Sequence, residues 1–143
     1  IAKALGGTGG PNPIKEIGWG EVVVAENNEA RAWFGETRGF TAFHWHGETF
    51  SLPSGATTIL SSAHCQNQAF VMGRHLAMQC HVEMTEEMVK DWCAIGAEEI
   101  AAAATSPGVQ AVGVIQQDMP TRLSGLNQVA GKLYRHWIEG LVP

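Results

Sequence analysis

Cysteine is scarce in this sequence. There are three cysteines in 143 residues, at positions 65, 80 and 93, and no Cys-x-x-Cys pair. An odd number at irregular spacing favours free thiols over a disulfide framework or a structural zinc site. Basic residues are also few, since nine Lys and Arg stand against fourteen Asp and Glu, and they form no run. The formal charge of -5 argues against nucleic acid or an anionic membrane as a partner.

The chain also lacks an apolar stretch long enough to span a membrane, and its first residues do not have the pattern of a signal peptide. We therefore expect a cytoplasmic protein with no membrane partner. What the chain does contain is ordinary for one folded domain, with 45% hydrophobic and 16% charged residues. It shows no internal repeat and no low-complexity linker.

Turn residues divide the chain into segments whose periodicity predicts strands first and helices afterwards. Residues 1–7 have the composition of the last turns of a helix closed by glycine. The predicted strands are 17–25, 40–46, 57–62, 69–72 and 75–80. Turns are predicted at 27–29 and at Gly73 and Arg74, the second of which would join its two neighbouring strands as a hairpin. The predicted helices are 85–104, 109–117 and a last helix after 119–121, whose apolar face is Leu126, Val129, Leu133, Trp137 and Leu141. We expect a single α/β domain over 1–143, with strands and site loops over 15–83 and helices over 85–141.

An apolar segment, 76–80, runs into a His-x-Glu step formed by His81 and Glu83, and a helix-start signal follows directly. Thr85 is a capping residue, and two acids come after it. This places an imidazole and a carboxylate at the carboxyl end of a strand, where open α/β sheets carry their active sites. Residues two apart on an extended segment point the same way, so we expect Glu83 to orient the ring of His81. Such a pair is the base and orienter of a nucleophilic triad, although a strand-end histidine is more often structural.

A second group of polar residues lies on the predicted strand 40–46. If the strand extends through 48, then His44, His46 and Glu48 share one face. Two imidazoles and a carboxylate are typical ligands of a divalent metal, as in cupins and metallohydrolases. Those sites need a further His or acid at a set distance, and residues 49–51 supply none. The sequence therefore predicts no cofactor and no bound metal, with a metal-dependent enzyme using these three residues kept as an alternative.

Several segments occur in an order that matches a known family. They are ALGG at 4–7, EIGW at 16–19, HWHGETF at 44–50, LPSGA at 52–56, NQAF at 67–70 and the stretch 76–87. Together they resemble the C-terminal part of a class I glutamine amidotransferase domain, similar to the glutaminase half of GMP synthetase. In that family the segment matching 79–83 usually reads Gln-Phe-His-Pro-Glu. Here Cys80 and Val82 replace the Phe and the Pro, and Glu48 replaces the usual Asp.

The resemblance implies a three-layer, flavodoxin-like α/β domain, here lacking its N-terminal strands. It implies that His81 and Glu83 complete a Cys-His-Glu triad and that His46 helps to form the wall of the glutamine pocket. Because ALGG ends the helix that follows the nucleophile in the family, the nucleophilic Cys would lie upstream of Ile1. None of the three cysteines in this chain is a convincing nucleophile.

The implied activity is hydrolysis of the glutamine side-chain amide to glutamate and ammonia, with a synthetase or another ammonia acceptor as partner. The chain alone would then be inactive without the portion that carries the Cys. Three alternatives remain open: a γ-glutamyl peptidase of the same fold, a catalytically silent binding module, and the metal-dependent enzyme described above.

Overall fold

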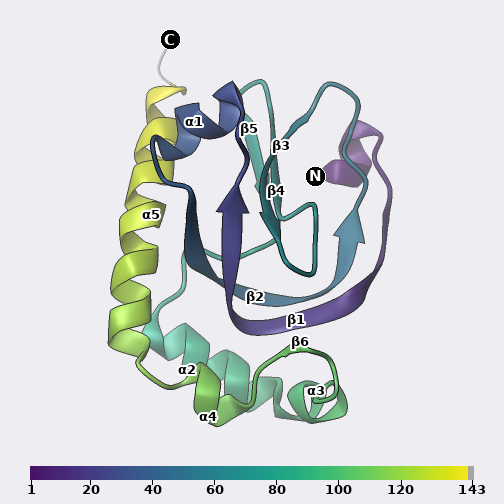
Figure 1. The fold of residues 1–143 in the computed structure, drawn as a ribbon, viewed down its shortest axis with the longest axis vertical. Coiled ribbons are helices and arrows are strands. Elements are labelled where there is room, and N and C mark those ends of the chain that lie inside the picture. Colours follow the sequence, from purple (N-terminus) through teal and green to yellow (C-terminus); the bar gives the residue numbers. More distant parts are fainter. Residues whose placement is uncertain (142–143) are drawn as a thin grey trace.

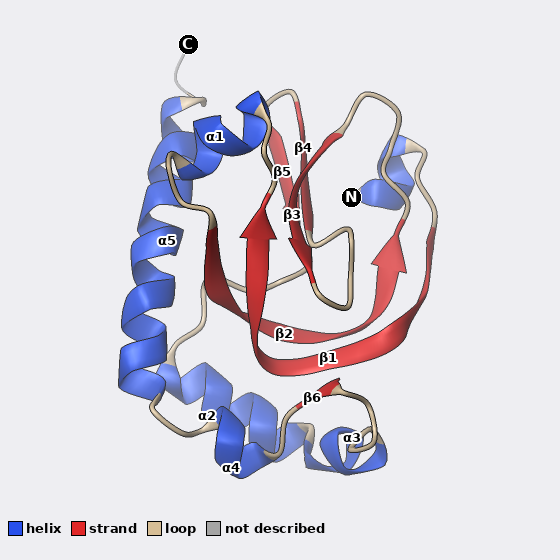
Figure 2. Cartoon of the chain, in the orientation of Figure 1, coloured by secondary structure: helices blue, strands red, loops and turns tan. Residues whose placement is uncertain are grey.

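The computed structural model describes residues 1–141, and its central element is a strongly curled sheet (Figure 1; Figure 2). The strands are β1 (Gly9–Val24), β2 (Gly39–Phe50), β3 (Thr57–Ser62), β4 (Ala69–Met72), β5 (His75–Met78) and β6 (Gly108–Val109). Their order is β2-β1-β3-β4-β5 with antiparallel neighbours, and β6 pairs parallel to β1. The two long strands β1 and β2 curve together across the molecule, which brings the edges of the sheet toward each other.

A backbone bridge joins those two edges. β2 and β5 stand at opposite ends of the strand order, yet the segment that follows β5 reaches β2. The His81 N–H donates to the Phe43 carbonyl at 2.8 Å, and the Phe43 N–H donates to the His81 carbonyl at 3.2 Å. The curl of the sheet therefore decides where His81 lies.

Apart from the N-terminal 3₁₀ helix, which lies on the opposite side, the helices flank one side and one end of the sheet (Figure 1). They are the short 3₁₀ helix η1 (Ala2–Leu5), α1 (Asn28–Phe34), α2 (Glu86–Ile95), α3 (Ala97–Ala102), α4 (Val112–Ile115) and α5 (Met119–Glu139). The long α5 contacts α1 and β2, while α2 contacts α3, α4 and α5. The apolar core between these elements includes the buried Phe43, Met84, Leu126 and Leu133.

Most of the predicted elements are confirmed. The strands predicted at 57–62 and 69–72 have those bounds, and a turn at Gly73 and Arg74 joins β4 to β5 as a hairpin. The helical turn at the start of the chain ends at Gly6, which has the positive φ of 86° that favours glycine. Thr85 caps α2 by accepting a hydrogen bond from the Met88 N–H at 3.2 Å. The mixed α/β class follows from these elements.

Several element predictions were wrong in part. Residues 27–29 read as a turn, but Asn27 is the N-cap of α1, which the sequence reading missed because the helix has only seven residues. The strand predicted to reach Cys80 ends at Met78, since the chain leaves β4 there to reach β2. Only 112–115 of the helix predicted at 109–117 is helical, because Gly108 and Val109 pair with β1. The predicted break at 119–121 lies one residue earlier, at Asp118, so that α5 already begins at Met119.

The helix predicted over 85–104 is two helices that meet at Gly96. A Cβ at Gly96 would lie 2.2 Å from the Trp45 ring, so the indole fills the space that a side chain would need. The predicted apolar face of the last helix, α5, is only partly buried. Leu126 and Leu133 are buried, whereas Trp137 remains 44% exposed.

Within residues 1–141, no helix combines the length and the apolar character that crossing a membrane requires.

The contact between Trp45 and Gly96 predicts a large effect of a small substitution. Gly96→Ala forces the Cβ against the indole, although the φ of -91° at Gly96 suits any residue. We expect a loss of about 1–3 kcal/mol in the free energy of unfolding, the usual cost of overpacking. Urea denaturation of the purified protein measures this loss.

Gly131→Ala is the matched control. Gly131 lies within α5, and a Cβ there would meet no atom within 4 Å. This substitution should stabilise the protein by about 0.5–1 kcal/mol because alanine loses less backbone entropy in a helix than glycine. Equal effects of the two substitutions would show that the indole does not constrain Gly96.

Candidate functional site

His81 and Glu83 lie side by side just after the bridge to β2. The Nδ1 atom of His81 lies 2.6 Å from Oε1 of Glu83, and the second carboxylate oxygen accepts a hydrogen bond from the Val82 N–H at 2.9 Å. The carboxylate is therefore fixed by the backbone as well as by the imidazole. With a proton on Nδ1, the Nε2 atom of His81 carries a lone pair. No described residue forms a hydrogen bond with this Nε2 atom.

The ring of His81 is held from a second side by α2. Trp92 meets it edge to face, with ring centroids 4.9 Å apart and an interplanar angle of 86°. The His81 side chain is 28% exposed and the Glu83 side chain 42% exposed. The pair is thus fixed in place by the backbone bridge and the indole while part of its surface stays open to a reactant.

Electrostatics favour the ionised form of Glu83. The hydrogen bond from His81 is the largest cause that lowers the pKa of Glu83, and the N–H groups of Glu83 and Val82 add to it against partial burial. An ionised Glu83 can stabilise an imidazolium at His81, which is the state that His81 would enter on accepting a proton.

A second polar cluster lies inside the curled sheet, around Glu16 of β1. Oε2 of Glu16 lies 3.2 Å from Nε2 of His46, accepts a hydrogen bond from the Gln68 amide at 2.8 Å, and lies 3.1 Å from the Ser62 hydroxyl. Glu16, His44 and Gln68 are almost completely buried. Gln79 lies 3.1 Å from Nδ1 of His46 and completes the cluster.

Burial acts on the two ionisable groups of this cluster differently. Burial raises the pKa of Glu16, but the hydrogen bond from His46, the charge of His44 and the Ser62 hydroxyl outweigh it, so the pKa lies below 4.5. For His44, burial is the largest cause and lowers the pKa below 6.5 against the opposing charge of Glu16. Both shifts keep Glu16 ionised and His44 neutral near neutral pH.

The predicted site residues do not form one cluster in the structure. His81 and Glu83 are in contact, whereas the hydrogen bonds of His46 go to the buried cluster. Glu48 is exposed, and its backbone carbonyl, not its carboxylate, lies 3.1 Å from Nδ1 of His46. The residue that joins His44 and His46 is Glu16, which the sequence reading did not select because it lies 28 positions before His44 in the chain. The strand pairing of EIGW with HWH was the signal that could have found it, since Glu16 pairs with His46.

The three cysteines are all buried and free. Burial raises the pKa of Cys80 to about 12 and also raises the pKa of Cys93. The thiol of Cys65 lies 3.3 Å from the Thr49 hydroxyl and accepts a hydrogen bond from Gln79. These surroundings suit structural thiols.

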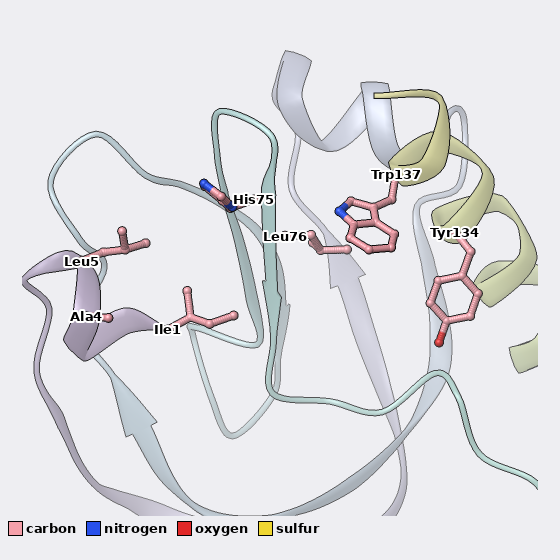
Figure 3. Close-up of a pocket in the computed structure, with 7 residues that line it drawn as sticks. All are labelled: Ile1, Ala4, Leu5, His75, Leu76, Tyr134 and Trp137. Atoms are coloured by element: carbon pink, nitrogen blue, oxygen red, sulfur yellow. The ribbon is translucent and has the colours of Figure 1, made fainter. Parts of the chain in front are cut away.

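An apolar cavity of about 560 Å³ lies beside α5 (Figure 3). Its lining residues come from the η1 segment, the β4–β5 hairpin and α5: Ile1, Ala4, Leu5, His75, Leu76, Tyr134 and Trp137. Tyr134 is close enough to Glu83 for the carboxylate charge to add to burial in raising the tyrosine pKa. The wall of the cavity that α5 supplies therefore lies near the His81–Glu83 pair.

The sequence matches no protein-family model and no curated protein, but several solved structures are similar to it. A glutamine amidotransferase from Methylobacillus flagellatus is 40% identical, with a TM-score of 0.93 over 99% of this chain and 59% of that one. A glutamine amidotransferase from Thermotoga maritima is 25% identical, with a TM-score of 0.81 over 96% of this chain and 57% of that one.

A protein from Thermoplasma acidophilum, described as a candidate GMP synthase subunit, is 23% identical and shares the fold. Its TM-score is 0.52 over 73% of this chain and 55% of that one. This chain thus spans only a little over half the length of each of the three relatives.

The two pKa shifts in the buried cluster predict loss of stability in acid. A lowered pKa means that the unfolded chain binds the proton more readily, so the contribution of each group is lost as the pH falls. The contribution of His44 should decline below pH 6.5 and that of Glu16 below pH 4.5. We expect the urea midpoint to fall in these two windows as the pH is lowered from 7.

Glu16→Gln should flatten the lower window and deepen the upper one, because it removes the carboxylate charge that opposes the fall in the pKa of His44. Glu36→Gln, which changes an exposed loop residue, is the control and should leave both windows unchanged. A urea midpoint that does not vary with pH between 7 and 4 would contradict the pKa shifts.

Proposed function

We propose that this chain, which has the class I glutamine amidotransferase fold, provides the proton-transfer half of a site that hydrolyses the side-chain amide of glutamine to glutamate and ammonia. The observation that carries the proposal is the 2.6 Å contact between His81 and Glu83 on a segment fixed by its backbone bridge to β2. The coverage of 99% of this chain by the Methylobacillus flagellatus glutamine amidotransferase supports it.

In the proposed reaction a cysteine thiolate attacks the side-chain amide carbon of glutamine. His81 takes the thiol proton at Nε2 and then gives it to the leaving amine, so that ammonia departs and a thioester remains. A water molecule, deprotonated by His81, hydrolyses the thioester to glutamate and restores the thiol. Glu83 keeps the proton of the imidazole on Nδ1 and stabilises the imidazolium in both steps.

The proposal assigns the nucleophile to a cysteine outside residues 1–143. Burial raises the pKa of both Cys80 and Cys93, which opposes a thiolate at either residue. This chain also spans 59% of the length of the Methylobacillus flagellatus protein, so a complete domain of that kind has room for a further portion. Within the same proposal, this further portion packs against the apolar cavity between Ile1 and Trp137 (Figure 3), whose walls suit apolar side chains.

A synthetase or another ammonia acceptor as partner and a cytoplasmic location belong to the same proposal. The role of His46 in the wall of a glutamine pocket stays a prediction, since its hydrogen bonds lie within the buried cluster.

The proposal predicts that His81→Ala abolishes most glutaminase activity in the complete protein that contains this chain. Loss of a triad histidine removes both proton transfers, so we expect kcat to fall by about four orders of magnitude or more. Ammonia release from glutamine measures the effect. Labelling by a chloroketone analogue of glutamine, followed by peptide mapping, should identify a cysteine outside these 143 residues in the wild type and no labelled cysteine in the variant.

The orienting role of Glu83 is tested separately by Glu83→Gln, with Glu87→Gln on α2 as the matched control. The amide at position 83 cannot stabilise an imidazolium, and kcat should fall by several orders of magnitude, whereas the exposed Glu87 should tolerate the change. Near-normal glutaminase activity in His81→Ala, with an unchanged unfolding midpoint, would refute the assignment. Labelling of Cys65, Cys80 or Cys93 would refute the location of the nucleophile.

A further inference from the structure

The Glu16 cluster brings one carboxylate and two imidazoles together inside the sheet. One ligand atom from each of Glu16, His44 and His46 lies within 4.8 Å of the other two. The separation between Oε2 of Glu16 and Nε2 of His46 is 3.2 Å. In a tetrahedral site with metal–ligand bonds of about 2.0–2.1 Å, neighbouring ligand atoms lie about 3.3 Å apart. Glu16 and His46 are therefore already spaced as two ligands of one ion.

Each of the two imidazoles has one ring nitrogen close to a backbone carbonyl. Nε2 of His44 lies 3.3 Å from the Gly20 carbonyl, and Nδ1 of His46 lies 3.1 Å from the Glu48 carbonyl. With its proton on the ring nitrogen that faces the carbonyl, each imidazole would have a lone pair on the other nitrogen, as in most histidine ligands of metals. For His46 this other nitrogen is Nε2, which without an ion lies 3.2 Å from Oε2 of Glu16 and 3.2 Å from the Gln68 amide, so a bound ion would replace these two contacts. Nδ1 of His44 is buried and has no hydrogen-bond partner among the described residues.

Two neutral side chains donate hydrogen bonds to the Glu16 carboxylate. The Ser62 hydroxyl donates to Oε1 of Glu16 at 2.9 Å and the Gln68 amide donates to Oε2 at 2.8 Å. These neutral donors orient the carboxylate without neutralising its charge. Among the described residues, no Lys or Arg forms an ion pair with Glu16. A metal ion would add a positive charge beside the carboxylate, whose titratable neighbours are the imidazoles of His44 and His46.

Access to the cluster is also present. A cavity of about 180 Å³ is lined by Glu16 and His44 together with residues of β1 and the segment that leads to β6. The cavity gives an approach to two of the three ligand residues, Glu16 and His44, and His46 does not line it.

We propose that Glu16, His44 and His46 bind a divalent transition-metal ion of the zinc type. Two imidazoles and one carboxylate suit Zn²⁺ and Co²⁺ better than Mg²⁺ or Ca²⁺, which prefer oxygen ligands. Three protein ligands leave a fourth position for water. The site goes beyond the proposed glutamine chemistry and does not depend on it, because it uses neither His81 nor Glu83.

Metal titration of the purified protein after dialysis against a chelator tests the proposal. We expect Zn²⁺ to bind with one-to-one stoichiometry by calorimetry and Co²⁺ to give the intense visible absorption of a four-coordinate site. X-ray absorption of the zinc-loaded wild type should show two imidazole ligands. This last measurement needs no variant and decides the ligand set even if a substitution prevents folding.

Variants then locate the ion. Glu16→Gln and His46→Ala should each remove the cobalt absorption, whereas His75→Ala on β5 should bind as the wild type does. Ser62→Ala, which removes a hydrogen-bond donor to the carboxylate and no proposed ligand, should weaken binding by about tenfold to a hundredfold.

Absence of saturable binding in the wild type would overturn the proposal and leave the cluster as a hydrogen-bonded group inside the sheet. Binding that is unchanged in Glu16→Gln and His46→Ala would also overturn it, since the ion would then lie elsewhere.

Discussion

The backbone bridge between Phe43 and His81 is the constraint on which the rest of the structure depends. It joins two segments from opposite ends of the strand order, and it can form only because β1 and β2 curl far enough to bring the edges together. Phe43 is fully buried and packs edge to face with Trp19 and with Trp92. The aromatic core that packs against the curled sheet thus also sets the position of the His81 imidazole. Trp92 contributes to both, because it contacts Phe43 as well as His81.

The sequence was informative wherever local chemistry decides the structure. The helix start at Thr85 and the hairpin at Gly73 depend on neighbouring residues, and both were predicted from them. The short spacing of His81 and Glu83 is local in the same sense. By contrast, the break of the helix at Gly96 depends on Trp45, a residue 51 positions away, whose indole occupies the space beside the glycine. No period or turn signal carries that information.

The same distinction explains the buried cluster. His44 and His46 were selected from the sequence as residues on one face of a strand, and Glu48 was assigned to them because it continues the alternation. The structure pairs them with Glu16 because β1 lies beside β2 in a register that sets Glu16 opposite His46 and Gly18 opposite His44. A ligand contributed by another strand can be found only when the register is known. Gly20 has a related role, since a Cβ there would lie 3.0 Å from the His44 ring.

Strand β2 also separates the surroundings of the His81–Glu83 pair from the Glu16 cluster. Successive side chains of a strand point to opposite faces. Phe43 and Trp45 face the aromatic group that includes Trp92 and, through it, His81. His44 and His46 face Glu16 on the other side. An ion held there would bind β1 to β2 and hold the curl of the sheet, because its ligands come from these two strands. Its effect on the proposed glutamine chemistry would pass through the position of the Phe43–His81 bridge and not through direct contact with the reacting atoms.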